Sequence, residues 1–262
     1  MGIVNVTPDS FSDGGKFFSP AKAVAQALNL AAQGAEILDI GGESTRPGAE
    51  PVDEAEELRR VIPVIKKLAT ELKIPLSIDT MKPAVAHTAL DAGASIVNDV
   101  AANRKDGTMW KVVAEFRAGY VCMHAQAGPR MMQKNPAYKN VVSEVSGFFR
   151  ERLEKLNAYG VSSDQVMFDP GIGFDKTLEH NLQLLANLRR FTKLKRPLLL
   201  GVSRKSFIGK LLGTTLNERL PASLACATLA IADGVQIIRA HNVAETIQAV
   251  RLAEALLARN RN

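Results

Sequence analysis

Cysteine is scarce in this chain, which carries only Cys122 and Cys226 among its 262 residues. Cys122 lies in an apolar, strand-like segment and Cys226 in a helical pattern, so the two do not form a disulfide framework. Long apolar runs are also lacking, and none approaches the roughly 18 residues that a membrane-spanning helix needs. These absences exclude a disulfide-stapled secreted domain and an integral membrane protein.

The first residues lack the features of a targeting segment. Residues 2–12 have neither the basic start nor the long apolar stretch of a signal peptide. Val6 stands where an N-myristoylation signal requires Ser or Thr. We therefore expect a cytoplasmic protein with no membrane partner.

Clustered positive charge is missing as well, although the net charge is +6 and the pI is about 9.4. Lysine and arginine are spread among aspartate and glutamate, without long basic blocks or interleaved aromatic residues. This pattern favours a solvated basic surface, which also attracts small anionic substrates, over nucleic-acid binding. Apolar residues make up 46% and charged residues 23% of the chain, so it has ample material for a folded core.

One pattern repeats from end to end: a short apolar segment, a polar loop and an amphipathic helical segment. The apolar segments do not alternate with polar residues, which is typical of parallel strands covered on both faces. We expect strands at residues 2–6, 36–40, 75–78, 95–97, 120–123, 166–168, 198–202 and 235–239.

Eight such units in a chain of nearly the roughly 250 residues typical of a closed barrel predict the α/β class and a (β/α)₈ TIM barrel. No linker or low-complexity segment interrupts the pattern, so we expect a single domain, residues 1–262. A doubly wound open sheet is the alternative, but no glycine-rich dinucleotide fingerprint follows the first strand.

A hydrogen-bonding side chain stands at or just beyond the end of every expected strand. The carboxyl ends of barrel strands meet on one face, where the active sites of this fold lie. A single such residue is more often a helix cap, but eight together predict a site. The eight residues are Asn5, Asp39, Asp79, Asn98, His124, Asp169, Ser203 and His241.

The ring divides into two chemical halves, which we expect on opposite sides of the barrel mouth. Asp79, Asn98 and Asp169 form the acidic half and call for adjacent N–H donors, such as the 2-amino-4-oxo edge of a pterin or guanine. The alternative partner is a basic side chain of the protein, and Lys205 can serve.

The second half is cationic and predicts a phosphate site after the seventh and eighth strands. Arginine supplies a bidentate fork for phosphate oxygens, and histidine adds a donor. Asn5, next to the eighth strand in a closed barrel, can hold Mg²⁺ through its amide oxygen. The residues of the cationic half are Ser203, Arg204, Lys205, Arg239 and His241.

The same residues lie in segments that resemble the signatures of bacterial dihydropteroate synthases, in the order of that family and over essentially the whole chain. NVTPDSFSDGG at residues 5–15 and DIGGESTRPG at residues 39–48 are the most specific, together with GVSRKSFIG at residues 201–209. DPGIGF at residues 169–174 and RAH at residues 239–241 also match.

The resemblance implies a pterin-binding barrel that condenses 6-hydroxymethyl-7,8-dihydropterin pyrophosphate with 4-aminobenzoate to give 7,8-dihydropteroate and pyrophosphate, in folate synthesis. It further implies Mg²⁺-assisted departure of pyrophosphate before the arylamine attacks, a homodimer, and inhibition by sulfonamides that mimic 4-aminobenzoate. The catalytic roles fall to Asn5, Asp79, Lys205, Arg239 and His241, with Asn5 as the metal ligand.

Substrate contacts follow from the same resemblance. Asp79, Asn98, Asp169 and Lys205 are expected to hold the pterin, and Arg46 the pyrophosphate. The expected aminobenzoate pocket consists of Thr45, Pro47, Phe174, Lys205 and Ser206. Gly201, Arg239 and His241 complete the expected substrate-binding residues.

Several positions depart from the family's pattern and bear on loop geometry and sulfonamide sensitivity. They are Ala101, Ala102, Ala127, Gly128, Asp175 and Asn242. The chain also begins directly in its first strand, so the resemblance places the natural start upstream. Two alternatives stay open: a non-catalytic pterin-binding homologue, and a methyltetrahydrofolate-binding domain of a corrinoid methyltransferase.

Overall fold

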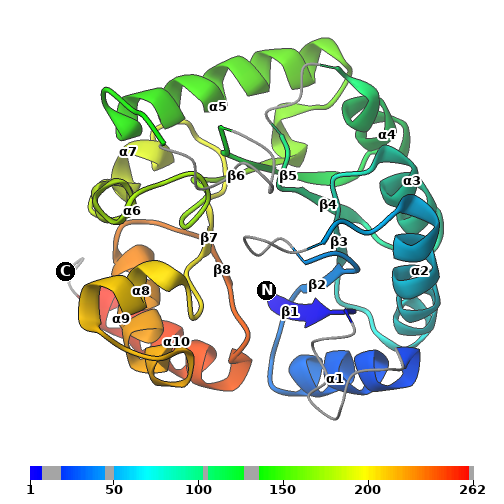
Figure 1. The fold of residues 1–262 in the computed structure, drawn as a ribbon, viewed down its shortest axis with the longest axis horizontal. Helices are drawn as coiled ribbons and strands as arrows, with labels where there is room; N and C mark the ends of the chain where they lie inside the picture. Colours follow the sequence, from blue (N-terminus) through cyan, green and yellow to red (C-terminus); the bar gives the residue numbers. More distant parts are fainter. Residues whose placement is uncertain (8–18, 45–49, 103–105, 127–135, 260–262) are drawn as a thin grey trace.

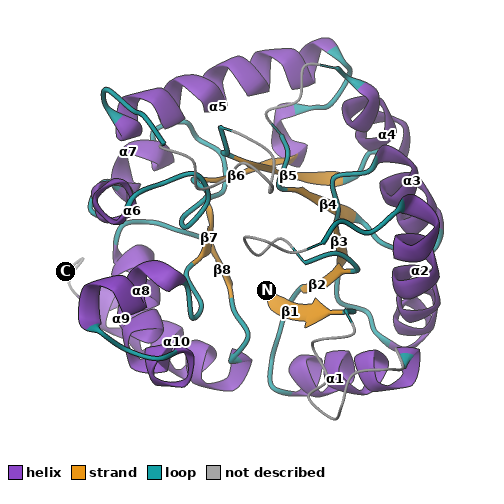
Figure 2. Ribbon diagram, viewed as in Figure 1, coloured by secondary structure: helices purple, strands orange, loops and turns teal. Residues whose placement is uncertain are grey.

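The computed structural model describes residues 1–7, 19–44, 50–102, 106–126 and 136–259. Within these residues the chain is an α/β TIM barrel: parallel strands line the centre and helices form the outer ring (Figure 1, Figure 2). The strands are β1 (Gly2–Asn5), β2 (Leu38–Gly41), β3 (Leu76–Asp79), β4 (Ile96–Asp99), β5 (Gly119–Met123), β6 (Val166–Asp169), β7 (Leu199–Gly201) and β8 (Ile237–Arg239).

Two seams close the barrel. Strands β1 to β6 pair in sequence order as one parallel sheet, and β7 pairs with β8. Phe168 forms a parallel bridge to Leu198, which joins β6 to the β7 side. Gly2 forms a parallel bridge to Ala240, and the N-terminal amino group donates to Ile238 O at 2.9 Å. The first strand is thereby fixed beside the last, as a closed barrel requires.

The helices cover the outside of the strands and bury one face each. Their bounds are α1 (Pro20–Ala32), α2 (Glu54–Glu71), α3 (Pro83–Asp91), α4 (Thr108–Phe116), α5 (Val141–Ala158), α6 (Leu178–Leu185), α7 (Leu188–Thr192), α8 (Ser206–Leu212), α9 (Leu220–Ala232) and α10 (Val243–Arg259). In α2 the buried residues Val61, Val64, Ile65 and Leu68 are spaced by three or four positions. Residues with this spacing lie on the same face of an α-helix.

The core has two parts because strand side chains alternate between the two faces of the sheet. In β5, Tyr120 and Cys122 point outward into the large cluster that joins strands to helices. Val121 points inward, where it packs with Ile96 and Leu199. The strands are therefore apolar on both faces, which explains why the sequence shows no alternation there.

All eight expected strands are present, and each end lies within two residues of the expected one. Asp79 and Asp169 are the last residues of β3 and β6, and His124 follows β5. Asp39 is the exception, since it lies two residues before the end of β2. A carboxylate fits inside the barrel at that position because it has an arginine partner, described below.

Candidate functional site

Four polar side chains from four strands meet at the mouth of the barrel. Arg239 donates through Nε to Asp39 Oδ2 at 2.6 Å and through Nη2 to Asp79 Oδ2 at 2.8 Å. Asn98 donates through Nδ2 to the same Asp39 oxygen at 2.9 Å. The parallel register explains the meeting, because Asp79 lies opposite both Gly41 in β2 and Asn98 in β4.

The carboxylates of this group are buried and only partly satisfied. Asp39 is fully buried and Asp79 is 9% exposed. Asp39 Oδ1 and Asp79 Oδ1 have no hydrogen-bond partner among the described residues. Burial raises the pKa of Asp79 to about 7, the nearby Arg239 opposes this rise, and Asp39 adds to it. Two buried acceptors without partners are suited to N–H donors of a ligand.

Asp169 and Lys205 approach the same mouth from β6 and from the segment after β7. Asp169 Oδ1 accepts the backbone N–H of Gly171 at 2.7 Å. Lys205 Nζ donates to the backbone carbonyl of Ile172 and lies 4.6 Å from the ring centre of Phe174. Burial lowers the pKa of Lys205 to about 8, against the opposing charge of Asp169. Ammonium, carboxylate and aromatic ring thus share one side of the mouth.

Backbone geometry brings Lys205 to this place. Gly173 has φ +84°, and an added Cβ would lie 3.1 Å from Lys205 Cδ, so the loop after β6 passes directly against the lysine stem. Gly201 ends β7 beneath the lysine, and a Cβ added there would lie 3.7 Å from Lys205 Nζ. Ser206 begins α8, whose first amide groups have no partner within the helix.

His241 lies beyond β8 and contacts the end of β7. Its backbone N–H donates to Ser203 Oγ at 3.2 Å, and its Nδ1 lies 3.0 Å from the same oxygen. The side chain of Arg204 contacts the loop after β8, because its Nε donates to Asn242 Oδ1 at 3.0 Å. His241 and Ser203 therefore form an exposed polar edge, whereas Arg204 is occupied by the neighbouring loop.

Asn5 ends β1 and is half-buried. Its side-chain amide makes no hydrogen bond to any other described residue. Among the described residues, no group of three or more His, Cys, Asp or Glu side chains is placed to hold a metal ion. The amide oxygen of Asn5 is an oxygen donor at the end of β1 that is not used by the other described residues.

The structure corrects one expectation about the charges. The sequence predicts Arg239 opposite the acidic half, with the phosphate-binding groups, but it lies between Asp39 and Asp79. The reason is that two buried carboxylates need a compensating cation. Lys205 lies near Asp169. This is the alternative given above, in which a basic side chain of the protein partners the acidic half. The expected Thr45, Arg46 and Pro47 lie outside the described residues.

A lysine that the sequence did not single out stands behind this site. Lys176 Nζ donates to Phe174 O at 2.9 Å and to His124 O at 3.2 Å, and it lies 3.1 Å from His124 Nδ1. Burial lowers the pKa of Lys176 to about 7. It ties the loop after β6 to the end of β5. The sequence carries no signal for this role, because the contact with His124 joins residues that are 52 positions apart.

The departures from the family pattern have structural counterparts. Asp175 has φ +45°, the left-handed region that glycine adopts without strain. Ala102 is fully buried in the main core, and the N–H of Ala101 donates to Asp99 Oδ1 at 2.9 Å. Asn242 accepts from Arg204, as described above. Ala127 and Gly128 lie outside the described residues.

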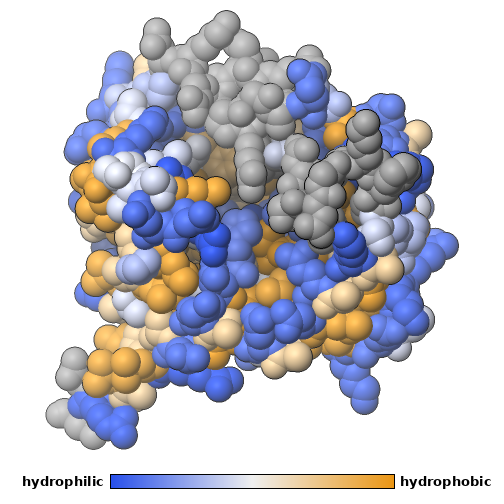
Figure 3. Space-filling model, turned by 60° about the horizontal axis from the view of Figure 1, so that its bottom comes forward, coloured by the Kyte–Doolittle hydropathy of each residue, from blue (hydrophilic) through white to orange (hydrophobic). Residues whose placement is uncertain are grey.

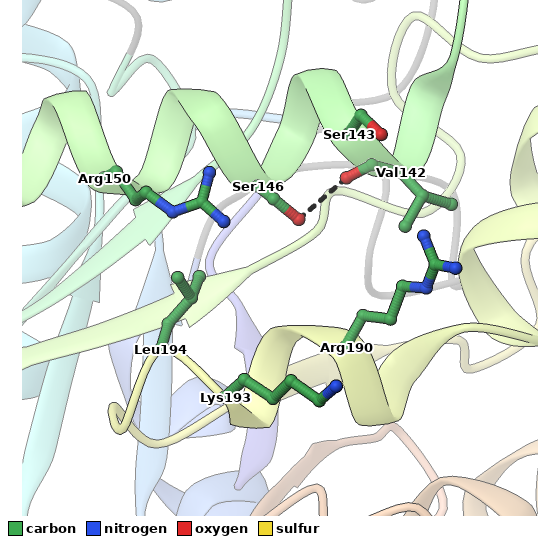
Figure 4. Close-up of a pocket in the computed structure, with 7 residues that line it drawn as sticks. All are labelled: Val142, Ser143, Ser146, Arg150, Arg190, Lys193 and Leu194. Carbon is green, nitrogen blue, oxygen red and sulfur yellow. Dashed lines mark hydrogen bonds between the residues drawn. The ribbon is translucent and has the colours of Figure 1, made fainter.

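A separate groove of about 430 Å³ lies outside the barrel between α5 and α7 (Figure 4). Arg150, Arg190 and Lys193 extend into it, and Ser146 donates to Val142 O at 2.8 Å at its upper wall. No residue expected at the mouth of the barrel lines this groove. Its exposed cations are typical of a basic surface. The candidate functional site is therefore the mouth of the barrel and not this groove.

Comparison with known proteins agrees with this geometry. The pterin binding enzyme family matches residues 1–241. Dihydropteroate synthase of Escherichia coli (strain K12) is 45% identical over 262 residues, covering 100% of this chain and 93% of the relative. The Yersinia pestis dihydropteroate synthase in a sulfonamide drug complex has a TM-score of 0.93 at 42% identity, covering 98% of this chain and 93% of that one. The Xanthomonas albilineans enzyme with 4-aminobenzoic acid has a TM-score of 0.91 at 46% identity, covering 98% and 92%.

Proposed function

The chain belongs to the pterin binding enzyme family, and we infer from this membership and from the site that it is a dihydropteroate synthase. It condenses 6-hydroxymethyl-7,8-dihydropterin pyrophosphate with 4-aminobenzoate to give 7,8-dihydropteroate and pyrophosphate. We propose that residues 1–262 form one pterin-binding barrel domain. The observation that carries the function is the convergence of Asp79, Asn98, Asp169, Lys205 and Arg239 on one mouth.

The pterin is proposed to bind over the acidic side of the mouth. The partnerless Oδ1 atom of Asp79 and the carboxylate of Asp169 are acceptors for the N–H edge of the heterocycle. Phe174 packs with Val100 and Met123 in a small apolar cluster at the same place. The carboxylates bind the edge of the flat ring and the apolar side chains contact its faces. Small-molecule pockets commonly combine apolar walls with a few polar groups in this way.

The diphosphate is proposed to lie toward β8 and β1. Arg239 uses Nε and one hydrogen of Nη2 for its carboxylate partners, so Nη1 keeps both of its hydrogens for phosphate oxygens. His241 and the first amide groups of α8 add donors. Negative charge grows on the departing pyrophosphate, so these donors stabilise the transition state more than the bound substrate.

We propose Mg²⁺ as the cofactor and Asn5 as its protein ligand. The amide oxygen of Asn5 is a hard donor that no described side chain occupies, and it stands at the proposed diphosphate end of the mouth. Bound Mg²⁺ supplies Lewis-acid charge for the leaving diphosphate. The buried carboxylates Asp79 and Asp169 stabilise the positive charge that develops on the pterin.

Thr45, Pro47, Phe174, Lys205 and Ser206 are proposed to receive 4-aminobenzoate, and Arg46 the pyrophosphate. Support comes from the described members of this set, since Lys205 and Phe174 are in contact. The Xanthomonas albilineans relative binds 4-aminobenzoic acid, and the Yersinia pestis relative a sulfonamide drug. We therefore propose that sulfonamides compete with 4-aminobenzoate in this protein.

A homodimer is proposed on the face formed by α8, α9 and α10. Figure 3 shows apolar surface on the side of the molecule where these helices lie. Contiguous exposed apolar surface is typical of association sites, and six large exposed leucines come from this part of the chain. They are Leu211 and Leu212 in α8, Leu216, Leu229 in α9, and Leu252 and Leu256 in α10.

A cytoplasmic location is part of the same proposal. Cys122 and Cys226 are both free thiols, as in proteins of reducing compartments. None of the helices in the described part of the chain has the length and apolar character needed to cross a bilayer.

The function is tested by incubating the purified protein with both substrates and Mg²⁺. We expect equal amounts of dihydropteroate and pyrophosphate, and no dihydropteroate when 4-aminobenzoate is left out. Binding of the pterin diphosphate in calorimetry without turnover would instead indicate a non-catalytic homologue. Tight binding of methyltetrahydrofolate that survives Lys205→Ala would indicate the methyltransferase alternative.

A further inference from the structure

Lys176 is a basic residue beside the mouth that the proposed chemistry does not use. Its Nζ donates to Phe174 O at 2.9 Å and to His124 O at 3.2 Å, and it lies 3.1 Å from His124 Nδ1. An ammonium group has three N–H donors and no acceptor. The three hydrogens of Lys176 therefore match three acceptors, two of them on His124 and one on Phe174.

This contact determines the tautomer of His124. An ammonium can only donate, so the imidazole Nδ1 accepts and the imidazole proton lies on Nε2. Burial lowers the pKa of His124 well below its usual value, and the positive charge of Lys176 lowers it further. The ring also packs edge-on against Phe148, with 4.9 Å between the two ring centres. His124 is therefore a neutral acceptor whose ring is held in place.

The backbone of His124 is fixed to the neighbouring strand. His124 directly follows β5, and its N–H donates at 2.9 Å to the carbonyl of Asp169, the last residue of β6. The loop after β6 starts close by, because a Cβ added to Gly171 would lie 2.0 Å from His124 O. Gly171 in turn donates its N–H to Asp169 Oδ1 at 2.7 Å. His124 is thus a fixed point of the sheet for the loop after β6.

The loop after β6 carries the aromatic ring that Lys205 faces. The ring centre of Phe174 lies 4.6 Å from Lys205 Nζ. Two carbonyls of this loop accept from lysines, Ile172 O from Lys205 and Phe174 O from Lys176. One lysine therefore joins the loop to the segment after β7, and the other joins it to the end of β5. The place of the Phe174 ring depends on both contacts.

The surroundings of Lys176 are unfavourable for a charge. Burial lowers the pKa of Lys176 to about 7, Asp169 and Asp175 oppose this, and the charge of Lys205 adds to it. The atoms that accept its hydrogens are carbonyl oxygens and a neutral imidazole, which compensate an ammonium less well than a carboxylate does. Groups with such shifted pKa values occur most often at functional sites. Together with the contact to Phe174, this favours a role in the site over a role in stability.

We propose that Lys176 is a positioning residue for 4-aminobenzoate, acting by fixing the backbone of Phe174 against the neutral imidazole of His124. The inference rests on the proposed function, which gives Phe174 and Lys205 to the aminobenzoate pocket. A wall of the pocket contacts the bound substrate and the transition state alike. Its displacement therefore weakens binding of 4-aminobenzoate more than it slows the chemical step.

The principal test is Lys176→Met, which keeps the length of the side chain and removes all three donors. We expect the KM for 4-aminobenzoate to rise about tenfold, while kcat changes by less than about threefold. The control is Lys155→Met, which removes the exposed Lys155–Glu151 pair of α5 and should change neither value. An unchanged KM, with or without a fall in kcat, would overturn the proposal.

Two substitutions of His124 form a matched pair. His124→Asn places an amide oxygen close to the position of Nδ1 and keeps an acceptor for Lys176, whereas His124→Leu removes it. The KM for 4-aminobenzoate should be at least about fivefold higher in His124→Leu than in His124→Asn. Lys176→Met combined with His124→Leu should be no worse than Lys176→Met alone, because both changes remove the same contact. Additive effects, or equal KM values for the matched pair, would contradict the proposal.

Nitrogen NMR of the wild-type imidazoles measures the contact directly and does not depend on catalysis. At about pH 6 we expect His124 to be neutral, with its proton on Nε2 and none on Nδ1. Loss of the signal in His124→Asn identifies the residue. A proton on Nδ1 at this pH would exclude the hydrogen bond from Lys176 and with it the proposal.

Hydrogen exchange reports the position of the loop. The Phe174 N–H donates to Gly171 O at 3.1 Å, and the Gly173 N–H donates to Asn181 Oδ1 at 2.7 Å. In Lys176→Met both amides should exchange at least about tenfold faster than in wild type, while those of β3 do not change. Unchanged exchange at Phe174 would mean that Lys176 does not fix it.

The outcomes separate this inference from the proposed function. If Lys176→Met does not fold, the KM and the exchange rates are measured in His124→Leu, with the same expected directions. If the wild-type protein makes no dihydropteroate, the proposed function fails. NMR and hydrogen exchange then still decide whether Lys176 fixes Phe174 against His124.

Discussion

Arg239 in the last strand of the barrel and Asp79 in the third are joined by an ion pair of 2.8 Å across the mouth. The same guanidinium also contacts Asp39 in β2 at 2.6 Å, so one cation compensates two buried carboxylates. This arrangement leaves the group one positive charge short when both acids are ionised. A proton on Asp79, or a positively charged ligand, can supply the missing charge, and the effect of pH on stability measures the proton.

The first prediction concerns the pH dependence of stability at Asp79. Its pKa is raised by burial to about 7, so between about pH 4 and pH 7 the folded protein binds more protons at this group than the unfolded chain. The free energy of unfolding of wild type should therefore fall, relative to Asp79→Asn, as the pH rises through this window. The total change is up to about 4 kcal/mol, from about 1.36 kcal/mol per pKa unit.

Urea unfolding of both proteins at a series of pH values measures this difference. Asp91→Asn serves as the control for the same substitution at an exposed site, because Asp91 lies at the solvent-exposed end of α3. A difference between wild type and Asp79→Asn that does not change with pH would contradict the raised pKa.

Lys205→Met should abolish most activity without unfolding the protein. The ammonium contacts the loop after β6 and stands beside Asp169 and Phe174, so its loss removes a charge from the centre of the proposed pocket. We expect kcat/KM to fall at least about 100-fold, which corresponds to about 3 kcal/mol. Burial lowers the pKa of Lys205, so its charge is not stabilised by the fold, and the Tm should not drop.

Steady-state rates of dihydropteroate formation and a thermal melt test this prediction. Lys210→Met, an exposed change in helix α8, which follows Lys205, should leave both values as in wild type. Retention of activity within about tenfold in Lys205→Met would remove the lysine from the pocket.

Asp175 provides a backbone test of the loop after β6. Its φ of +45° is favourable for glycine and strained for alanine. Asp175→Gly should therefore be more stable than Asp175→Ala by about 1 kcal/mol, a Tm difference of roughly 2–4 °C for a chain of this size. Both variants lose the carboxylate, so their difference isolates the backbone.

The same pair of substitutions at Asp233 is the control, because its φ of −87° gives glycine no advantage. Equal Tm values for Asp175→Gly and Asp175→Ala would show that the loop relaxes to another conformation.

Asn242→Asp should strengthen the contact with Arg204, whose Nε donates to Asn242 Oδ1 at 3.0 Å. Replacing the amide by a carboxylate converts a hydrogen bond into an ion pair at a half-buried place. We expect a coupling energy of about 0.5 kcal/mol in a double-mutant cycle with Arg204→Gln, and a smaller one in 1 M salt. A coupling energy near zero at low salt would mean that the two side chains do not interact in solution.

Asn5→Ala tests the proposed metal ligand. We expect the Mg²⁺ concentration for half-maximal activity to rise at least about tenfold, since one protein oxygen ligand is lost. Affinity for the pterin diphosphate without metal should not change. Asn5→Asp keeps an oxygen donor and should retain the wild-type response, and an unaltered Mg²⁺ requirement in Asn5→Ala would exclude Asn5 as a ligand.

The sequence was sufficient for the fold, and it placed several polar side chains at the strand ends. The repeated apolar segments predicted all eight strands, because the spacing of apolar residues is set locally by strand and helix geometry. The strand ends predicted Asp79, Asn98 and Asp169 on one face, because parallel strands share their direction. The lysine at position 176 was missed because nothing in its local spacing distinguishes it from a surface lysine.

What the sequence determined by itself is therefore the order of strands and helices, the polar residues at the strand ends and the family's motifs that contain them. Only the tertiary structure decided the pairing: Arg239 meets Asp79 and Asp39 across 160 and 200 residues of chain. Such contacts depend on barrel closure and on the cost of leaving a buried carboxylate without a cation, and neither has a signature in local sequence. For the same reason Lys82 is an ordinary lysine before a helix in the sequence, whereas in the fold its Nζ donates to the buried Glu57 Oε2 at 2.6 Å.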